Sequence, residues 1–152
     1  MSVSARLDDM PFDLACELKA LSSVAMNDGA LVSFVGLARS TSKQGEPVEQ
    51  LVLEHHVQLT QRSLEQIATD AAERFDVSHV RVVHRCGPIG AGEPIVFAAA
   101  TAPHRQTAFQ AVDYLMDRLK TDAVFWKREE STAGSVWIEP TEADFAARGR
   151  WD

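Results

Sequence analysis

The segment 119–129 (LKTDAVFWKRE) holds the residues best suited to chemistry. The 15 basic residues of the chain include only four lysines, and two of these, Lys120 and Lys127, lie beside Phe125 and Trp126. A lysine in a partly apolar pocket, near another cation, has a lowered pKa and can serve as a base or a nucleophile. Singly, Lys120 could be a favourable cation at a helix C-terminus, and Lys127 an exposed strand residue. Their clustering favours a shared catalytic role.

A further basic pair and a single arginine are candidates for binding an anion. His104 and Arg105 lie at the predicted start of a helix, where free N–H groups and the helix dipole attract negative charge. A cation is unfavourable for stability at this end of a helix, which indicates a functional role, although both side chains could simply point to solvent. Arg39 ends a predicted buried strand at the start of a polar loop, where it is either a ligand contact or a solvated arginine.

Other motifs are excluded as sites. The run 87–92 (GPIGAG) lacks the Lys-Ser/Thr pair of a P-loop and precedes a strand, so it is interpreted as a turn. His55 and His56 have no partner at metal-ligand spacing and point to opposite faces of a strand, so no metal site is expected. Cys16 and Cys86 form neither a metal motif nor a disulfide framework, which indicates a reducing cytoplasm. No cofactor is expected.

Composition limits the class of protein. The 152 residues fit one domain, 1–152, and 45% hydrophobic with 24% charged residues excludes disorder. No apolar run approaches the roughly 20 residues of a membrane span, and the first ten residues lack a secretory signal. The net charge of -7 argues against binding to nucleic acid.

Hydrophobic periodicity predicts alternating strands and helices. In the first half we expect a helix at 11–22, a buried strand at 30–38, a mobile loop at about 39–48, a strand at 51–56 and a helix from 60 that is capped by Thr60. In the second half we expect strands at 80–86 and 94–101, a helix at 103–120 that begins near Pro103, a closing strand pair at 124–129 and 135–139, and a short helix at 141–147 that is capped by Thr141. Because strands come in pairs, we predict an α+β sandwich with a mixed or antiparallel sheet.

These motifs together resemble the family of large, catalytic subunits of molybdopterin synthase (MoaE-like). The resemblance is carried by GALVSFVGLAR at 29–39, LEH at 53–55, GPIGAGE at 87–93, His104-Arg105 before a helix that ends at Lys120, and FWKRE at 125–129. It covers about residues 28–139. It implies a single domain of the α/β-hammerhead type. It also implies a cytoplasmic sulfurtransferase that converts cyclic pyranopterin monophosphate into the dithiolene of molybdopterin.

The resemblance also implies partners and roles. Sulfur would arrive as a thiocarboxylate on the C-terminal glycine of a small ubiquitin-like sulfur-carrier subunit, and a homodimer of large subunits would form a heterotetramer with two small ones. Lys120 and Lys127 would be catalytic. The substrate-binding residues would be Arg39, His104, Arg105, Phe34, Met116 and Arg128, with His104 and Arg105 coming from the neighbouring protomer.

Two positions depart from the family pattern. His56 stands where tyrosine is common, and a packing role is expected there. Thr141 follows Glu139-Pro140 where some members carry an arginine of the anion site, so that contact is either absent or supplied by Arg128 or Arg148.

Two alternative functions are open from the sequence. One is a non-catalytic module that binds a ubiquitin-like tail or an anionic metabolite, although arginines alone would serve binding and the lysine pair favours an enzyme. The other is a lyase that forms a Schiff base through Lys120 or Lys127.

Overall fold

The computed structural model describes residues 2–152 and contains two four-stranded sheets within that range. The first sheet has the order β1-β4-β6-β2, formed by β1 (Ser2–Asp8), β4 (His79–Arg85), β6 (Pro94–Ala102) and β2 (Ala30–Leu37). The second has the order β5-β3-β7-β8, formed by β5 (Gly87–Gly90), β3 (Gln50–His55), β7 (Phe125–Ser131) and β8 (Gly134–Ile138). The β1–β4 pair is parallel and the other neighbours are antiparallel, which confirms the predicted α+β class.

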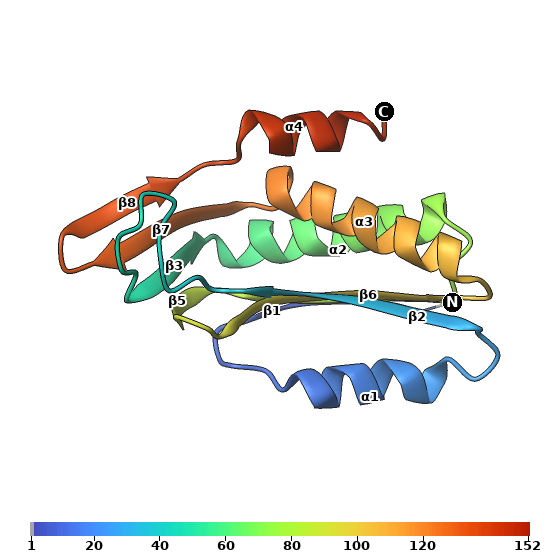
Figure 1. The fold of residues 1–152 in the computed structure, drawn as a ribbon. Helices are drawn as coiled ribbons and strands as arrows, with labels where there is room; N and C mark the ends of the chain where they lie inside the picture. Colours follow the sequence, from blue (N-terminus) through green and yellow to red (C-terminus); the bar gives the residue numbers. More distant parts are fainter. Residues whose placement is uncertain (1) are drawn as a thin grey trace.

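Helices cover both faces of the first sheet (Figure 1). Helix α1 (Leu14–Val24) lies on one face, while α2 (Val57–Arg74) and α3 (Arg105–Thr121) lie on the other, with α4 (Glu142–Gly149) outside α3. Strand alternation explains this sandwich, because neighbouring residues of β4 enter different cores. Val82 packs with α2 and α3, whereas Val83 packs on the α1 side.

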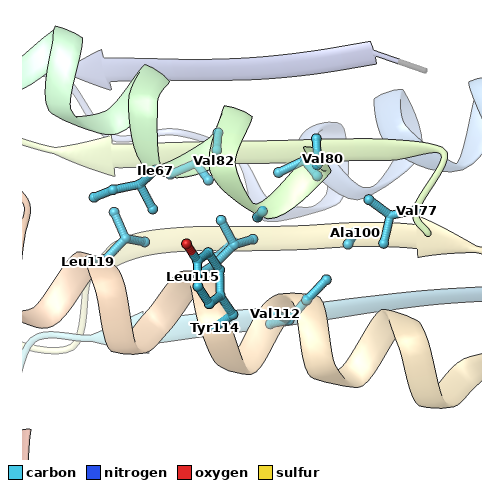
Figure 2. Packing of buried hydrophobic residues seen from close by; sticks show 14 of the residues in the cluster. Ile67, Val77, Val80, Val82, Ala100, Val112, Tyr114, Leu115 and Leu119 are labelled. Atoms are coloured by element: carbon cyan, nitrogen blue, oxygen red, sulfur yellow. The ribbon is translucent and has the colours of Figure 1, made fainter. Parts of the chain in front are cut away.

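The larger core lies between the first sheet and the helices α2 and α3. Figure 2 shows Ile67 of α2 and Leu115 and Leu119 of α3 facing the strand residues Val80 and Val82. These side chains are at most 4% exposed. The core therefore fixes the C-terminal end of α3, where Lys120 follows Leu119.

Several local features differ from the predictions. Strand β1 was not predicted, because it pairs with β4 across more than 70 residues of sequence and contains few large apolar residues. Residues 87–90 form the edge strand β5 rather than a turn, since Pro88 is tolerated at a sheet edge. Helix α2 begins at Val57 with His56 as its N-cap, so Thr60 is not the cap. Likewise α3 begins at Arg105, two residues after Pro103.

The polar segment 39–48 connects β2 to β3 through a tight backbone turn. The Ser42 amide donates to the Glu46 carbonyl at 2.8 Å, and Thr41 forms an isolated bridge with Pro47. The mobility expected for this loop stays a prediction. None of the helices formed by residues 2–152 has the length and apolarity needed to cross a membrane.

Thr60 connects α2 to the segment that joins α3 to β7. Its buried hydroxyl donates to the Val124 carbonyl at 2.6 Å and accepts from the His56 amide at 3.1 Å. This segment lies between Lys120 and Lys127, so Thr60 helps to fix both lysines.

We expect Thr60→Val to lower the free energy of unfolding by about 1–3 kcal/mol, because two partly buried backbone groups lose their partner. Thr60→Ser keeps the hydroxyl and is the matched control, with a loss of about 1 kcal/mol or less from the deleted methyl group. Urea denaturation measures both. A Thr60→Val protein as stable as the wild type would contradict this role.

Candidate active site

A pocket of about 830 Å³ lies where the two sheets, the end of α3 and the start of α4 meet. Five of the eight predicted site residues line it: Phe34, Arg39, Met116, Lys120 and Lys127. They come from β2, the loop after it, α3 and β7. The structure thus brings together residues that are up to 93 positions apart in sequence (34 to 127).

Strand alternation places Lys127 inside the pocket. Phe125, Lys127 and Glu129 line the pocket from one face of β7, while Trp126 on the other face is 53% exposed. Partial burial, assisted by the positive charge of Lys120, lowers the pKa of Lys127 to about 8. Lys127 therefore has an appreciable neutral fraction near physiological pH.

Lys120 lies in the last turn of α3 and is exposed, at the mouth of the pocket. Asp144 faces it from the first turn of α4. The Asp144 carboxylate accepts from the Thr141 amide at 2.8 Å, and this bond, followed by the charge of Lys120, lowers the pKa of Asp144. Asp144 is thus a fixed anion that partly offsets the two ammonium groups.

The pocket concentrates cations on an acidic chain. Arg39, Lys43, Lys120 and Lys127 line it, so three of the four lysines of the chain are gathered here. Three carboxylates accompany them, from Glu129, Glu139 and Asp144. Lys43 was not predicted, although the scarcity of lysine that indicated Lys120 and Lys127 applies equally to it.

His84 is a second pocket residue that the sequence did not indicate. It is 4% exposed on β4, and its ring stacks on Phe125 with the centroids 4.3 Å apart. Burial lowers the pKa of His84 to about 3, and the charges of Lys127 and Lys120 act in the same direction. His84 is therefore neutral at physiological pH.

His104 and Arg105 lie at the opposite end of α3 from Lys120. The 17 residues of this helix separate the two ends by about 25 Å. Both side chains are exposed, and His104 is an N-cap without a side-chain capping bond. Neither residue lines the pocket of its own chain.

Arg128 lies on the face of β7 opposite to Lys127. Its guanidinium pairs with Glu54 and Glu130 and stacks over Trp137 at 5.5 Å. Arg148 of α4 pairs with Asp122, the C-cap of α3, and with Asp152. Neither arginine lines the pocket, so neither supplies there the anion contact considered for position 141.

Two polar residues of interest have structural roles. Thr141 forms a reciprocal capping box with Asp144, as its position predicted. The His56 ring accepts from the Leu59 amide at 3.1 Å as a helix cap, rather than packing. Within residues 2–152 no cluster of three or more His, Cys, Asp or Glu side chains is arranged to hold a metal ion.

Lys127 is a destabilising residue at neutral pH, because its ammonium group is charged and partly desolvated. A pKa lowered from 10.5 to about 8 means that this cost is complete below pH 8 and disappears as the pH rises to 10.5. We therefore expect Lys127→Met to raise the free energy of unfolding by about 1–3 kcal/mol at pH 7, with a smaller gain at pH 10. Denaturant titrations at both pH values measure the difference, and equal stability at pH 7 would contradict it.

Known proteins resemble this chain in sequence and in fold. The sequence model of the family described as MoaE protein matches residues 7–122. A molybdopterin synthase catalytic subunit from Pseudomonas aeruginosa is 39% identical over 150 residues, 99% of each chain. A molybdopterin biosynthesis MoaE protein from Burkholderia ambifaria has a TM-score of 0.82 at 37% identity, covering 98% of this chain and 97% of that one. A complex of subunits 1 and 2 of molybdopterin-converting factor from Helicobacter pylori shares the fold, with a TM-score of 0.72 at 19% identity over 90% of this chain and 89% of the other. The chain belongs to the MoaE family.

Proposed function

We propose that this pocket is the active site of a molybdopterin synthase catalytic subunit. Sulfur passes from the C-terminal thiocarboxylate of a small partner subunit to cyclic pyranopterin monophosphate, so the chain is a sulfurtransferase of molybdenum cofactor biosynthesis. The observation that carries the proposal is the gathering of three of the four lysines, with Arg39, in one pocket of an acidic chain. Both reactants are anions, and cations fixed around them stabilise the charge that develops during transfer.

Each transfer breaks the bond between the sulfur and the glycine carbonyl carbon. It also breaks a carbon–oxygen bond of the pterin and forms a carbon–sulfur bond at the same pterin carbon, and the displaced oxygen leaves as water or stays on the phosphate. The carbonyl carbon takes an oxygen from water and becomes a carboxylate. The Lys127 amine, with its pKa near 8, accepts and returns protons during these steps. Lys120 at the mouth holds the thiocarboxylate, and Arg39 holds the phosphate. Phe34 and Met116 provide an apolar wall for the ring.

The partner subunit docks at the mouth of the pocket. Leu37, Val136 and Trp137 line this mouth and are 56%, 60% and 58% exposed, an apolar surface that is suited to contact with a partner. A second copy of the chain supplies His104 and Arg105, since these lie too far from the pocket of their own chain.

The cytoplasm is the proposed compartment. Both cysteines are free thiols, Cys16 exposed and Cys86 buried. Free thiols are typical of a reducing environment. The buried Cys86 packs as a small apolar side chain at the end of β4 and takes no part in the chemistry.

We expect Lys120→Ala to abolish conversion of cyclic pyranopterin monophosphate by the thiocarboxylated partner, while dimer formation and partner binding stay intact. Lys19→Ala is the matched control, because Lys19 is an exposed lysine of α1 remote from the pocket. The assay is product formation together with size-exclusion chromatography of the complex. Full activity in Lys120→Ala would contradict the assignment of this residue. Wild-type protein that binds both reactants without converting them would instead indicate the non-catalytic module.

A subunit-mixing experiment tests whether Arg105 acts in the neighbouring pocket. Arg105→Ala and Lys120→Ala proteins are each expected to be inactive. If Arg105 serves the other protomer, each mixed dimer contains one intact site, and a statistical mixture recovers roughly a quarter of wild-type activity. If Arg105 served its own pocket, no mixed dimer would contain an intact site and no activity would return. The control mixes each variant with itself.

A further inference from the structure

The His84 ring has its donor and its acceptor assigned by its surroundings. Nδ1 lies 2.8 Å from the Arg85 carbonyl oxygen. A carbonyl can only accept, so Nδ1 carries the proton, and in the neutral ring Nε2 then holds a lone pair. The stacking of the ring on Phe125 fixes the plane in which this lone pair points.

The free nitrogen of His84 opens on the pocket. Within residues 2–152, the buried side-chain nitrogen and oxygen atoms without a partner are Arg85 Nε and Thr101 Oγ1. His84 Nε2 is not among them and makes no hydrogen bond there, so it keeps contact with solvent. Because the residue is 4% exposed and lines the pocket, the pocket provides that contact.

Burial, together with the charged groups around His84, keeps this nitrogen an acceptor. Lys127 on β7 and Lys120 on α3 both act against protonation of the ring, and Asp144 on α4 offsets them only in part. A lone pair repels the oxygens of a phosphate or a thiocarboxylate, which are acceptors too. The complementary ligand group is an N–H donor on an otherwise anionic molecule.

We propose that His84 is a specificity-determining residue, whose Nε2 accepts a hydrogen bond from a ring N–H of the pterin while the cations hold its phosphate. This inference rests on the proposed function. It explains how a cationic pocket discriminates a phosphorylated pterin from other small phosphates. A buried acceptor left without a donor disfavours a ligand that lacks the N–H group.

Two substitutions separate the roles of the ring nitrogens. His84→Asn keeps a donor near the Arg85 carbonyl and removes the distal acceptor, whereas His84→Gln restores an acceptor at the distal position. We expect His84→Asn to raise the Kd of cyclic pyranopterin monophosphate about tenfold, with the Kd of inorganic phosphate unchanged. His84→Gln is expected to recover most of the affinity. Arg39→Ala, by contrast, weakens both ligands.

Nitrogen-15 NMR of the wild-type ring provides a measurement that does not depend on folding of a variant. We expect the Nδ1–H tautomer from pH 5 to pH 8, and an Nε2 shift on adding the pterin phosphate but not inorganic phosphate. Three results would overturn the proposal. The first is equal pterin affinity in the wild type and His84→Asn. The others are an equal loss of affinity for the pterin phosphate and inorganic phosphate in His84→Asn, and an Nε2 signal that does not change when the pterin phosphate is added. Normal His84 behaviour without sulfur transfer to the bound pterin would overturn the proposed function alone.

Discussion

The mutual repulsion of two ammonium groups, Lys120 and Lys127, is the constraint on which the pocket depends. Each group favours solvent, and the fold instead holds them close enough that the charge of Lys120 helps to lower the pKa of Lys127. Burial of Lys127 adds to this repulsion and Asp144 offsets it only in part, so the pKa of Lys127 stays low, near 8. A carboxylate in direct contact with Lys127 would return its pKa toward the ordinary value and remove the neutral amine. The incomplete compensation is therefore what makes the amine usable.

Holding this arrangement requires that α3 and α4 do not separate. Asp122, two residues after Lys120, accepts from Arg118 at 2.5 Å and from Arg148 of α4 at 2.9 Å. Arg118 also pairs with Asp70 of α2 at 2.9 Å. Single surface ion pairs contribute only about 0–1 kcal/mol. Here the Asp122 carboxylate joins α3 to α4, and Arg118 links α3 to α2. The network therefore positions the end of α3 from several sides.

The sequence predicted the elements whose signal is local. The helix that carries Lys120 and the strand that carries Lys127 follow from periodicity, and Lys120 and Lys127 do share a pocket. What it did not predict depends on non-local pairing: β1 needs β4, and β5 needs β3, before either is recognisable as a strand. His84 could not be placed for the same reason, because its neighbour Phe125 belongs to the other sheet. The position of Arg128 outside the pocket could have been predicted, because strand alternation from Lys127 directs its side chain to the opposite face of β7.

The acidic surface and the cationic pocket are compatible because they act over different distances. A net charge of -7 opposes the approach of an anion, but salt screens exposed charges beyond about 8 Å at physiological ionic strength. Inside the pocket the partly buried Lys127 is screened less than an exposed charge, and Arg39, Lys43 and Lys120 surround the same space, so the cations dominate once the ligand has entered. Attraction by charge alone would accept many phosphates. A neutral acceptor among the cations adds a requirement that charge cannot supply. Burial keeps His84 neutral, and the same lysines that attract the anion reinforce it. Affinity and selectivity in this pocket thus arise from one electrostatic arrangement.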